Sequence, residues 1–148
     1  DLSVWGGKVR LCKGAYKEPA SIAFPGMADV NTNFDEITRL LFTSIKNANL
    51  PRISEDGITP PIAALATHDP LRIDFARQLV EEMQLPRDTI EFQMLFGIRR
   101  DLQEQIVKAG FPVRVYVPFG TQWYPYFMRR LAERPANLWF FISSFFRK

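Results

Sequence analysis

Four short apolar runs, each followed by a segment with helical spacing, restrict the fold of this sequence more than any other feature. The runs span residues 8–13, 62–66, 90–96 and 112–117. Runs of this length between turn residues indicate buried strands. Strands that alternate with helices form parallel β–α units. The chain is therefore predicted to be α/β, either as half of a closed barrel or as a small open sheet, and periodicity alone does not choose between the two.

Helices are expected to follow the strands. Asn33, with a glutamate three residues later, has the spacing of a capping box. Asp69 and Pro70 form a good helix start, a cap followed by a first-turn proline. Asp101 is expected to cap a third helix. The apolar faces predicted for the first two helices are Phe34, Ile37, Leu40, Leu41 and Ile45, and then Leu71, Phe75, Leu79 and Met83.

Two proline-containing stretches indicate loops, over residues 18–33 and 47–61. Because loop insertions are well tolerated, the second loop is expected to form a surface connection with no part in the chemistry. A fourth helix is predicted over residues 124–133, and the aromatic tail over 137–148 is expected to pack on the fold as a closing helix. A membrane-surface role for this tail is the alternative.

Cysteine and histidine content excludes several kinds of site. Cys12 is the only cysteine and His68 the only histidine, so the chain has neither an internal disulfide nor a zinc site built on several such residues. No metal site is expected. A single thiol fits a reducing compartment. The net charge of +3 is small and the basic residues are scattered among acidic ones, so no nucleic-acid partner is expected.

The chain shows no targeting or membrane-spanning pattern. No segment reaches the roughly 18 apolar residues of a transmembrane helix, and the start lacks the basic and apolar regions of a secretion signal. The sequence begins at Asp1 and reaches its first strand pattern within a few residues. We interpret it as a fragment, most simply a cloned piece.

Chemistry in a parallel α/β fold is expected at the carboxyl ends of the strands. In the first strand, Arg10 shares a face with Cys12, and an arginine inside an apolar strand is costly unless it is paired. Lys13 and Gly14 supply a cation and a backbone without bulk, which suits a phosphate. The alternative is a surface arginine followed by an ordinary glycine turn.

Thr67, His68 and Asp69 lie where the second strand becomes a helix. The amides at this helix start, with a hydroxyl and an imidazole, suit a pyrophosphate or the edge of a flavin. Alternatively, Asp69 only caps the helix and His68 only packs. A general-base role for His68 is conceivable, although the sequence shows no serine or cysteine partner.

Glu91, Gln93 and Leu95 share one face of the third strand. Two buried polar side chains in a strand need partners. Gln93 offers the donors and the acceptor that the pyrimidine edge of a flavin requires. A hydrogen-bond network without a ligand is an equally good interpretation.

Arg129 and Arg130 are the sharpest local signal. Adjacent arginines on a helix point roughly 100° apart, so two guanidinium groups can hold one small carboxylate from two sides. Glu133 follows Arg129 by four residues and is placed to pair with it. The alternative is a solvated basic face.

Five ordered stretches of the sequence resemble the proline dehydrogenase family, both its monofunctional enzymes and the catalytic domain of the bifunctional bacterial enzyme. They are VRLCKGAY at 9–16, ATHD at 66–69, EFQMLFG at 91–97, RVYVP at 114–118 and WYPYFMRRLAERPAN at 123–137. None is specific alone, but the set spans almost the whole chain in the family's order.

The resemblance implies a (β/α)8 TIM-type barrel, of which this chain supplies the last four β–α units and a C-terminal helix as one partial domain over residues 1–148. It implies that FAD is bound non-covalently and that L-proline is oxidised to Δ1-pyrroline-5-carboxylate by hydride transfer to flavin N5, with a membrane quinone as electron acceptor. The expected location is the cytoplasm, peripheral to the inner membrane face of a bacterium.

The resemblance also assigns roles to residues. Arg10 is the implied catalytic residue, beside flavin N5. The implied cofactor-binding residues are Arg10, Lys13, Gly14, Ala15, Thr67, His68, Gln93 and Glu133. The implied substrate-binding residues are Tyr16, Leu95, Tyr116, Arg129 and Arg130.

The family's first four barrel units have no counterpart in this sequence, so the chain is expected to be inactive without that N-terminal half. An open half barrel is also expected to be poorly soluble or to self-associate. The alternative function is a non-catalytic barrel remnant that binds an anionic ligand or a partner through Arg129 and Arg130.

Overall fold

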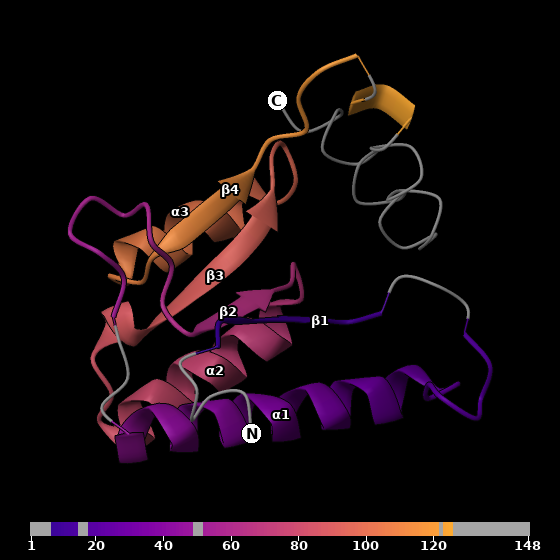
Figure 1. Ribbon diagram of the computed structural model, residues 1–148, viewed down its shortest axis with the longest axis horizontal. Helices are drawn as coiled ribbons and strands as arrows, with labels where there is room; N and C mark the ends of the chain where they lie inside the picture. The colour runs from indigo at the N-terminus through magenta and orange to yellow at the C-terminus, as the bar shows by residue number, and fades with distance from the viewer. Residues whose placement is uncertain (1–6, 15–17, 49–51, 122, 126–148) are drawn as a thin grey trace.

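The computed structural model describes residues 7–14, 18–48, 52–121 and 123–125 (Figure 1). Within these ranges the elements, in chain order, are β1 (Val9–Cys12), α1 (Met27–Ala48), β2 (Ala63–Ala66), α2 (Pro70–Met83), the 3-10 turn η1 (Arg87–Thr89), β3 (Ile90–Leu95), α3 (Arg100–Lys108) and β4 (Val113–Tyr116). The alternation of strands and helices predicted from the sequence is confirmed.

The strands form one parallel sheet in the order β1-β2-β3-β4, which is also their order in the chain (Figure 1). Every pair of neighbours is parallel. A doubly wound open sheet reverses its strand order at a switch point, whereas a barrel adds each new strand on the same side. The consecutive order therefore has the topology of a barrel segment.

One face of the sheet carries the hydrophobic core. Leu65 and Phe92 project from this face and are fully buried, together with Phe42 of α1, Ile73 of α2 and Ile106 of α3. The described helices thus cover the same face, as a barrel requires. Truncation of a buried phenylalanine to alanine typically costs about 3–5 kcal/mol, so this layer holds the fold together.

Helix α1 begins earlier than predicted, so Asn33 is not a cap. The helix starts at Met27, directly after Pro25 and Gly26, and Asn33 lies inside it. The apolar residues Met27 and Val30 already continue the helical spacing of Phe34 toward the N-terminus, and this pattern outweighs the capping-box spacing. The predicted loop over residues 18–33 is correspondingly shorter.

The buried faces of α1 and α2 are rotated from the prediction. In α1 the buried residues are Phe34, Thr38, Phe42 and Ile45, while Leu40 is 67% exposed. In α2 they are Ile73, Ala76, Leu79 and Val80, while Leu71 is 67% exposed. The predicted residues Leu41, Phe75 and Met83 are only partly buried against the core.

The predicted cap is confirmed for α2 and wrong for α3. Asp69 caps α2 as expected, because its side chain accepts a hydrogen bond from the N–H of Leu71 and Pro70 follows it. Asp101 does not cap α3. The residue at the cap is Arg99, in the left-handed conformation at φ 50°, and its guanidinium pairs with Asp101 inside the first turn.

Candidate functional site at the strand ends

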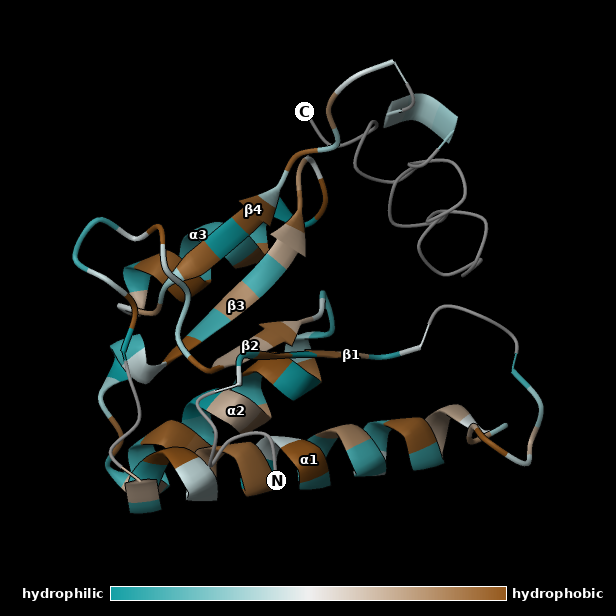
Figure 2. Cartoon of the chain, in the orientation of Figure 1, coloured by the Kyte–Doolittle hydropathy of each residue, from teal (hydrophilic) through white to brown (hydrophobic). Residues whose placement is uncertain are grey.

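The face of the sheet opposite the core is called here the polar face. It carries Arg10 and Cys12 from β1, Ala64 and Ala66 from β2, Glu91, Gln93 and Leu95 from β3, and Arg114 and Tyr116 from β4. Figure 2 shows hydrophilic bands within β3 and β4, between hydrophobic ones. The structure thus brings Arg10, Gln93, Leu95 and Tyr116 onto one surface.

Register orders these residues in layers toward the carboxyl end of the sheet. Arg10 lies level with Ala64 and Glu91, and Gln93 lies one layer further along, level with Cys12 and Arg114. Leu95 and Tyr116 are direct partners in the next layer. Arg10 and Tyr116 are exposed and Leu95 is half-buried.

Glu91 is the charged centre of the polar face and is completely buried. Arg114 donates hydrogen bonds to its carboxylate from two nitrogens, Nε at 2.9 Å from Oε1 and Nη2 at 3.0 Å from Oε2. Gln93 donates from Nε2 to Oε1 at 2.5 Å. A buried carboxylate without such partners would be strongly destabilising. The hydrogen-bond network left open by the sequence is present, and the flavin contact of Gln93 stays a prediction.

Arg114 also reaches the loop before β2. Its Nη2 donates to the carbonyl oxygen of Gly57 at 3.0 Å, and the bond to Glu91 raises the pKa of the guanidinium. Gly57 has φ +69°, a conformation that favours glycine. The loop therefore bonds to the polar network through one of its carbonyl groups, and its having no part in the chemistry stays a prediction.

His68 links β2 to β3. Its Nε2 accepts a hydrogen bond from the N–H of Leu95 at 2.9 Å. Burial, with a smaller effect from the charge of Arg99, lowers the pKa of His68 to about 4. The imidazole is therefore neutral at pH 7 with its proton on Nδ1. Because the Nε2 lone pair is occupied, the geometry gives no support to a general-base role.

Gln103, which sequence reasoning did not single out, completes the support of Leu95. Its Nε2 donates to the carbonyl oxygen of Leu95 at 3.2 Å and to that of Ile98 at 2.9 Å. The turn between them passes through Gly97 at φ +78°. Leu95 is thus held at its N–H by His68 and at its C=O by Gln103. An amide on the far side of a turn gives no sequence signal of its own.

Lys13 points into the helix layer and pairs with Asp69. Its Nζ lies 2.5 Å from Oδ2 of Asp69, and its side chain is only 8% exposed. The N–H of Asp69 donates to Oγ1 of Thr67 at 3.1 Å. Burial raises the pKa of Asp69, but the hydrogen bond and charge of Lys13, with the N–H of Leu71, outweigh it and leave the pKa lowered. The cofactor contacts of Lys13, Gly14 and Thr67 stay predictions.

A second ion pair continues this cluster onto α1. Nε of Arg72 lies 2.9 Å from Oδ1 of Asp35, although neither atom makes a well-directed hydrogen bond. Burial raises the pKa of Asp35, and the charges of Arg72 and Lys13 offset part of that effect. The cluster ties the end of β1 to both α1 and α2 and so fixes the rim of the sheet.

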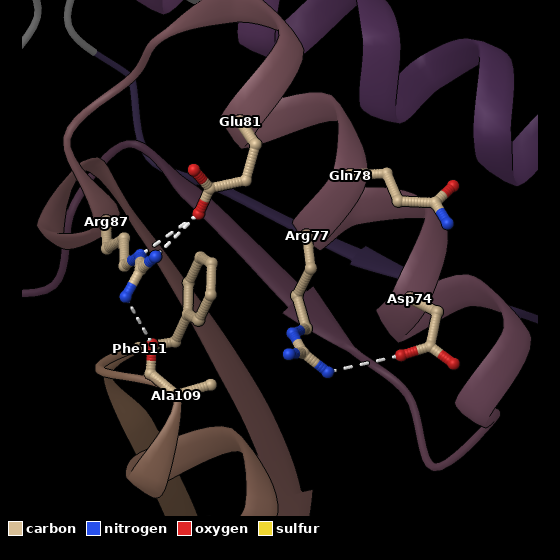
Figure 3. A pocket seen from close by; sticks show the side chains of 7 residues that line it. All are labelled: Asp74, Arg77, Gln78, Glu81, Arg87, Ala109 and Phe111. Carbon is tan, nitrogen blue, oxygen red and sulfur yellow. Dashed lines mark hydrogen bonds and ion pairs between the residues drawn. The ribbon is translucent and has the colours of Figure 1, made fainter.

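A groove on the outside of the fold lies away from the carboxyl ends of the strands. It has a volume of about 390 Å³ and is lined by Asp74, Arg77, Gln78, Glu81, Arg87, Ala109 and Phe111 (Figure 3). Arg87 pairs with Glu81 and lies over the ring of Phe111, and Arg77 pairs with Asp74. These charges are satisfied among themselves, and the groove borders the amino ends of β3 and β4, so it is not part of the candidate site.

The described part of the chain contains no group of three or more histidine, cysteine or acidic side chains that could hold a metal ion. Among the same residues, no helix has the length and apolar character required to cross a membrane. The predicted site residues Ala15, Tyr16, Arg129, Arg130 and Glu133 lie outside the described residues, as does the C-terminal tail.

The chain is similar in sequence to two bacterial proline dehydrogenases. The chain is 43% identical over 140 residues to proline dehydrogenase 1 of Bacillus subtilis, a match that covers 95% of this chain and 41% of the relative. It is 43% identical over 136 residues to the proline dehydrogenase of Deinococcus radiodurans, covering 92% of this chain and 39% of the relative. The chain thus spans about two-fifths of the length of these relatives.

A solved structure and a family model extend the comparison. The chain matches a crystal structure of proline utilization A from Bdellovibrio bacteriovorus, a protein inactivated there by N-propargylglycine. The TM-score is 0.69 and the identity 25%, over 88% of this chain and 14% of that one. The model of the proline dehydrogenase family matches residues 6–142. The chain therefore belongs to the proline dehydrogenase family.

Proposed function

We propose that this chain is the C-terminal half of a (β/α)8 barrel that oxidises L-proline to Δ1-pyrroline-5-carboxylate with FAD, and that a quinone accepts the electrons. The observation that carries the proposal is the polar face. Arg10, Gln93, Leu95 and Tyr116 come from three strands and gather on the side of the sheet that the described helices leave uncovered. In a barrel this side faces the lumen, toward whose carboxyl end ligands bind.

The donor set on this face fits a flavin. Arg10 supplies an exposed cation and Gln93 a half-buried amide in the adjacent layer. FAD supplies the hydride acceptor, N5, when it is bound. A cation at Arg10 favours the electron-rich reduced form and so raises the reduction potential. Thr67 and His68, at the start of α2, lie where a helix N-terminus suits phosphate oxygens.

The proposed substrate contacts come from the layer of the polar face nearest the carboxyl end of the sheet. Leu95 and Tyr116 are register partners and supply an apolar and an aromatic wall for a small ring. Such walls exclude water from the reacting atoms. Arg129 and Arg130 hold the substrate carboxylate in this proposal, and Tyr16 completes the wall. Two guanidinium groups on one carboxylate reduce the entropic cost of alignment.

The partial length of the chain shapes the proposal. Since the chain spans about two-fifths of the Bacillus relative, the remaining barrel units must come from another segment for the lumen to close. We propose that the chain alone is inactive. Because a quinone acceptor lies in a membrane, we propose that the completed enzyme works at a membrane surface, the cytoplasmic face of a bacterial membrane.

Reconstitution tests this function. The chain is co-expressed with the N-terminal part of Bacillus subtilis proline dehydrogenase 1 that its match does not cover, and proline-dependent dye reduction is measured with FAD present. We expect activity in the complex and none in either part. The double variant Arg129→Met, Arg130→Met should lose at least about a hundredfold in kcat/KM, because each lost charged hydrogen bond costs about 1.5–3 kcal/mol.

A matched control removes two exposed arginines elsewhere. Arg52 and Arg77 lie on the outer surface, each near an aspartate, and their change to methionine should leave the activity intact. A folded complex that binds FAD but does not oxidise proline would refute proline as the substrate. A folded complex that does not bind FAD would refute the enzyme proposal.

A further inference from the structure

The ion pair between buried Glu91 and half-buried Arg114 decides which end of the Gln93 amide faces outward. Ionised Glu91 can only accept hydrogen bonds, so the Gln93 atom that faces its Oε1 must be the amide nitrogen. The carbonyl oxygen of the same amide is directed away from Glu91. Gln93 therefore offers an acceptor on the side turned away from the charge pair.

Arg114 makes this orientation the favoured one. It has only donors, and two of its nitrogens hold the carboxylate of Glu91 from the β4 side. A third contact, to the carbonyl oxygen of Gly57, fixes the guanidinium from the loop before β2. The side chain of Glu91 is 1% exposed, so water does not compete for its oxygens. The carboxylate is thus immobilised before any ligand arrives.

We propose that Glu91 and Arg114 are positioning residues that fix Gln93 as a hydrogen-bond acceptor for the ring N–H of the flavin pyrimidine edge. This inference rests on the proposed function, which places a flavin on the polar face. The pyrimidine edge carries one N–H between two carbonyl groups, and the carbonyl oxygen of Gln93 complements that N–H. The other N–H of the Gln93 amide is free to serve a neighbouring carbonyl group of the ring.

The test compares the affinities of the reconstituted complex for FAD and for 3-methyl-FAD, in which a methyl group replaces that ring N–H. Binding is followed by the quenching of flavin fluorescence, without turnover. The wild-type complex should prefer FAD by about tenfold or more. The methyl group removes one buried hydrogen bond and leaves the acceptor of Gln93 unsatisfied, and both effects weaken binding. Gln93→Met, which removes the acceptor, should abolish most of this preference.

Glu91→Gln is the informative variant. Arg114 has only donors, so the new amide turns its oxygen toward Arg114 and its NH2 group toward Gln93. Gln93 then turns its own oxygen inward and presents its NH2 group to the flavin N–H, donor against donor. The FAD preference should fall to the level of Gln93→Met.

Two further variants separate positioning from folding. The pair Glu91→Met, Arg114→Met removes both charges and leaves no unpaired buried ion, so it should fold, yet it too should lose the preference because nothing orients Gln93. Glu81→Gln breaks an exposed glutamate–arginine pair on the outer groove (Figure 3) and should keep the wild-type preference.

The outcomes are distinct. A wild-type preference in Glu91→Gln, with the preference lost in Gln93→Met, overturns the positioning role and leaves the proposed function intact. Equal weakening of both flavins in Glu91→Gln shows a purely structural role and also overturns the inference. Retention of the preference in Gln93→Met shows that Gln93 does not meet the N–H. A wild-type complex that binds neither flavin refutes the proposed function and the inference with it.

Discussion

The imidazole of His68 extends the hydrogen bonding between β2 and β3 by one bond, since its Nε2 accepts from the N–H of Leu95 at 2.9 Å. Strand β2 ends at Ala66, where the chain turns toward helix α2. The side-chain nitrogen of His68 thus replaces a backbone carbonyl as acceptor at the point where β2 leaves the sheet. The bond requires a neutral imidazole, because a protonated Nε2 is itself a donor.

The stability contributed by His68 should depend on pH between about 4 and 6.5. The folded pKa is about 4 and the ordinary value is 6.5, so the unfolded state binds more protons in this window and stability rises with pH. The contribution is complete above pH 6.5 and is lost as the pH falls toward 4. Urea unfolding of the reconstituted complex should show a larger difference between wild type and His68→Gln at pH 7 than at pH 5. An equal difference at both pH values would contradict the assignment.

Gln103→Leu should destabilise the turn after β3. The substitution leaves the carbonyl oxygens of Leu95 and Ile98 without this donor, at a cost of about 1–3 kcal/mol in the free energy of unfolding. Under the proposed function it should also raise KM for proline, since Leu95 walls the substrate. Gln105→Leu, on the exposed side of the same helix, is the matched control and should change little. Equal effects of the two variants would argue against a role for Gln103.

Two variants should separate the two roles of Asp69, which caps α2 and forms an ion pair with Lys13. Asn at this position keeps the cap on the N–H of Leu71 but loses the charge that pairs with Lys13, whereas Ala loses both. Asp69→Ala should therefore destabilise the complex by about 1 kcal/mol more than Asp69→Asn. Because the folded pKa of Asp69 lies below the ordinary 3.8, the charge contributes above that pH and its contribution is lost at lower pH. The effect of Asp69→Asn should accordingly shrink in acid. Urea titrations at pH 7 and pH 3 would check both statements.

The chain without its barrel complement should self-associate. Within the described residues, β1 and β4 each pair on one side only, and exposed edges template further pairing. Phe96 is 51% exposed, Val117 57% and Phe119 97%, all near the carboxyl ends of β3 and β4. Light scattering after size-exclusion chromatography should give a dimer or larger species for the chain alone and a 1:1 complex with the complement. A sharp monomer peak with cooperative unfolding would contradict this prediction.

The local pattern of the sequence was sufficient for the positions of the strands and for one helix start. The strands are found where apolar runs predicted them, and Asp69 with Pro70 begins α2 as expected. These features depend on neighbours in the chain, such as a proline that fits only the first turn. The predicted start of α1 was wrong because the apolar spacing of Met27 and Val30 continues the helix beyond Asn33 toward the N-terminus. The predicted cap of α3 was wrong because Asp101 can also serve inside a first turn, where it pairs with Arg99.

The sequence by itself determined the α/β alternation, the face shared by Glu91, Gln93 and Leu95, and the family to which the chain belongs. Side-chain period along a strand is a local property, so alternation alone puts these residues together. Tertiary structure decided the partners. Glu91 with Arg114, Arg114 with Gly57, and His68 with Leu95 meet across strands and loops. The pairing of these groups depends on sheet register, which sequence spacing does not encode, and burial then makes each pairing strong because water is excluded.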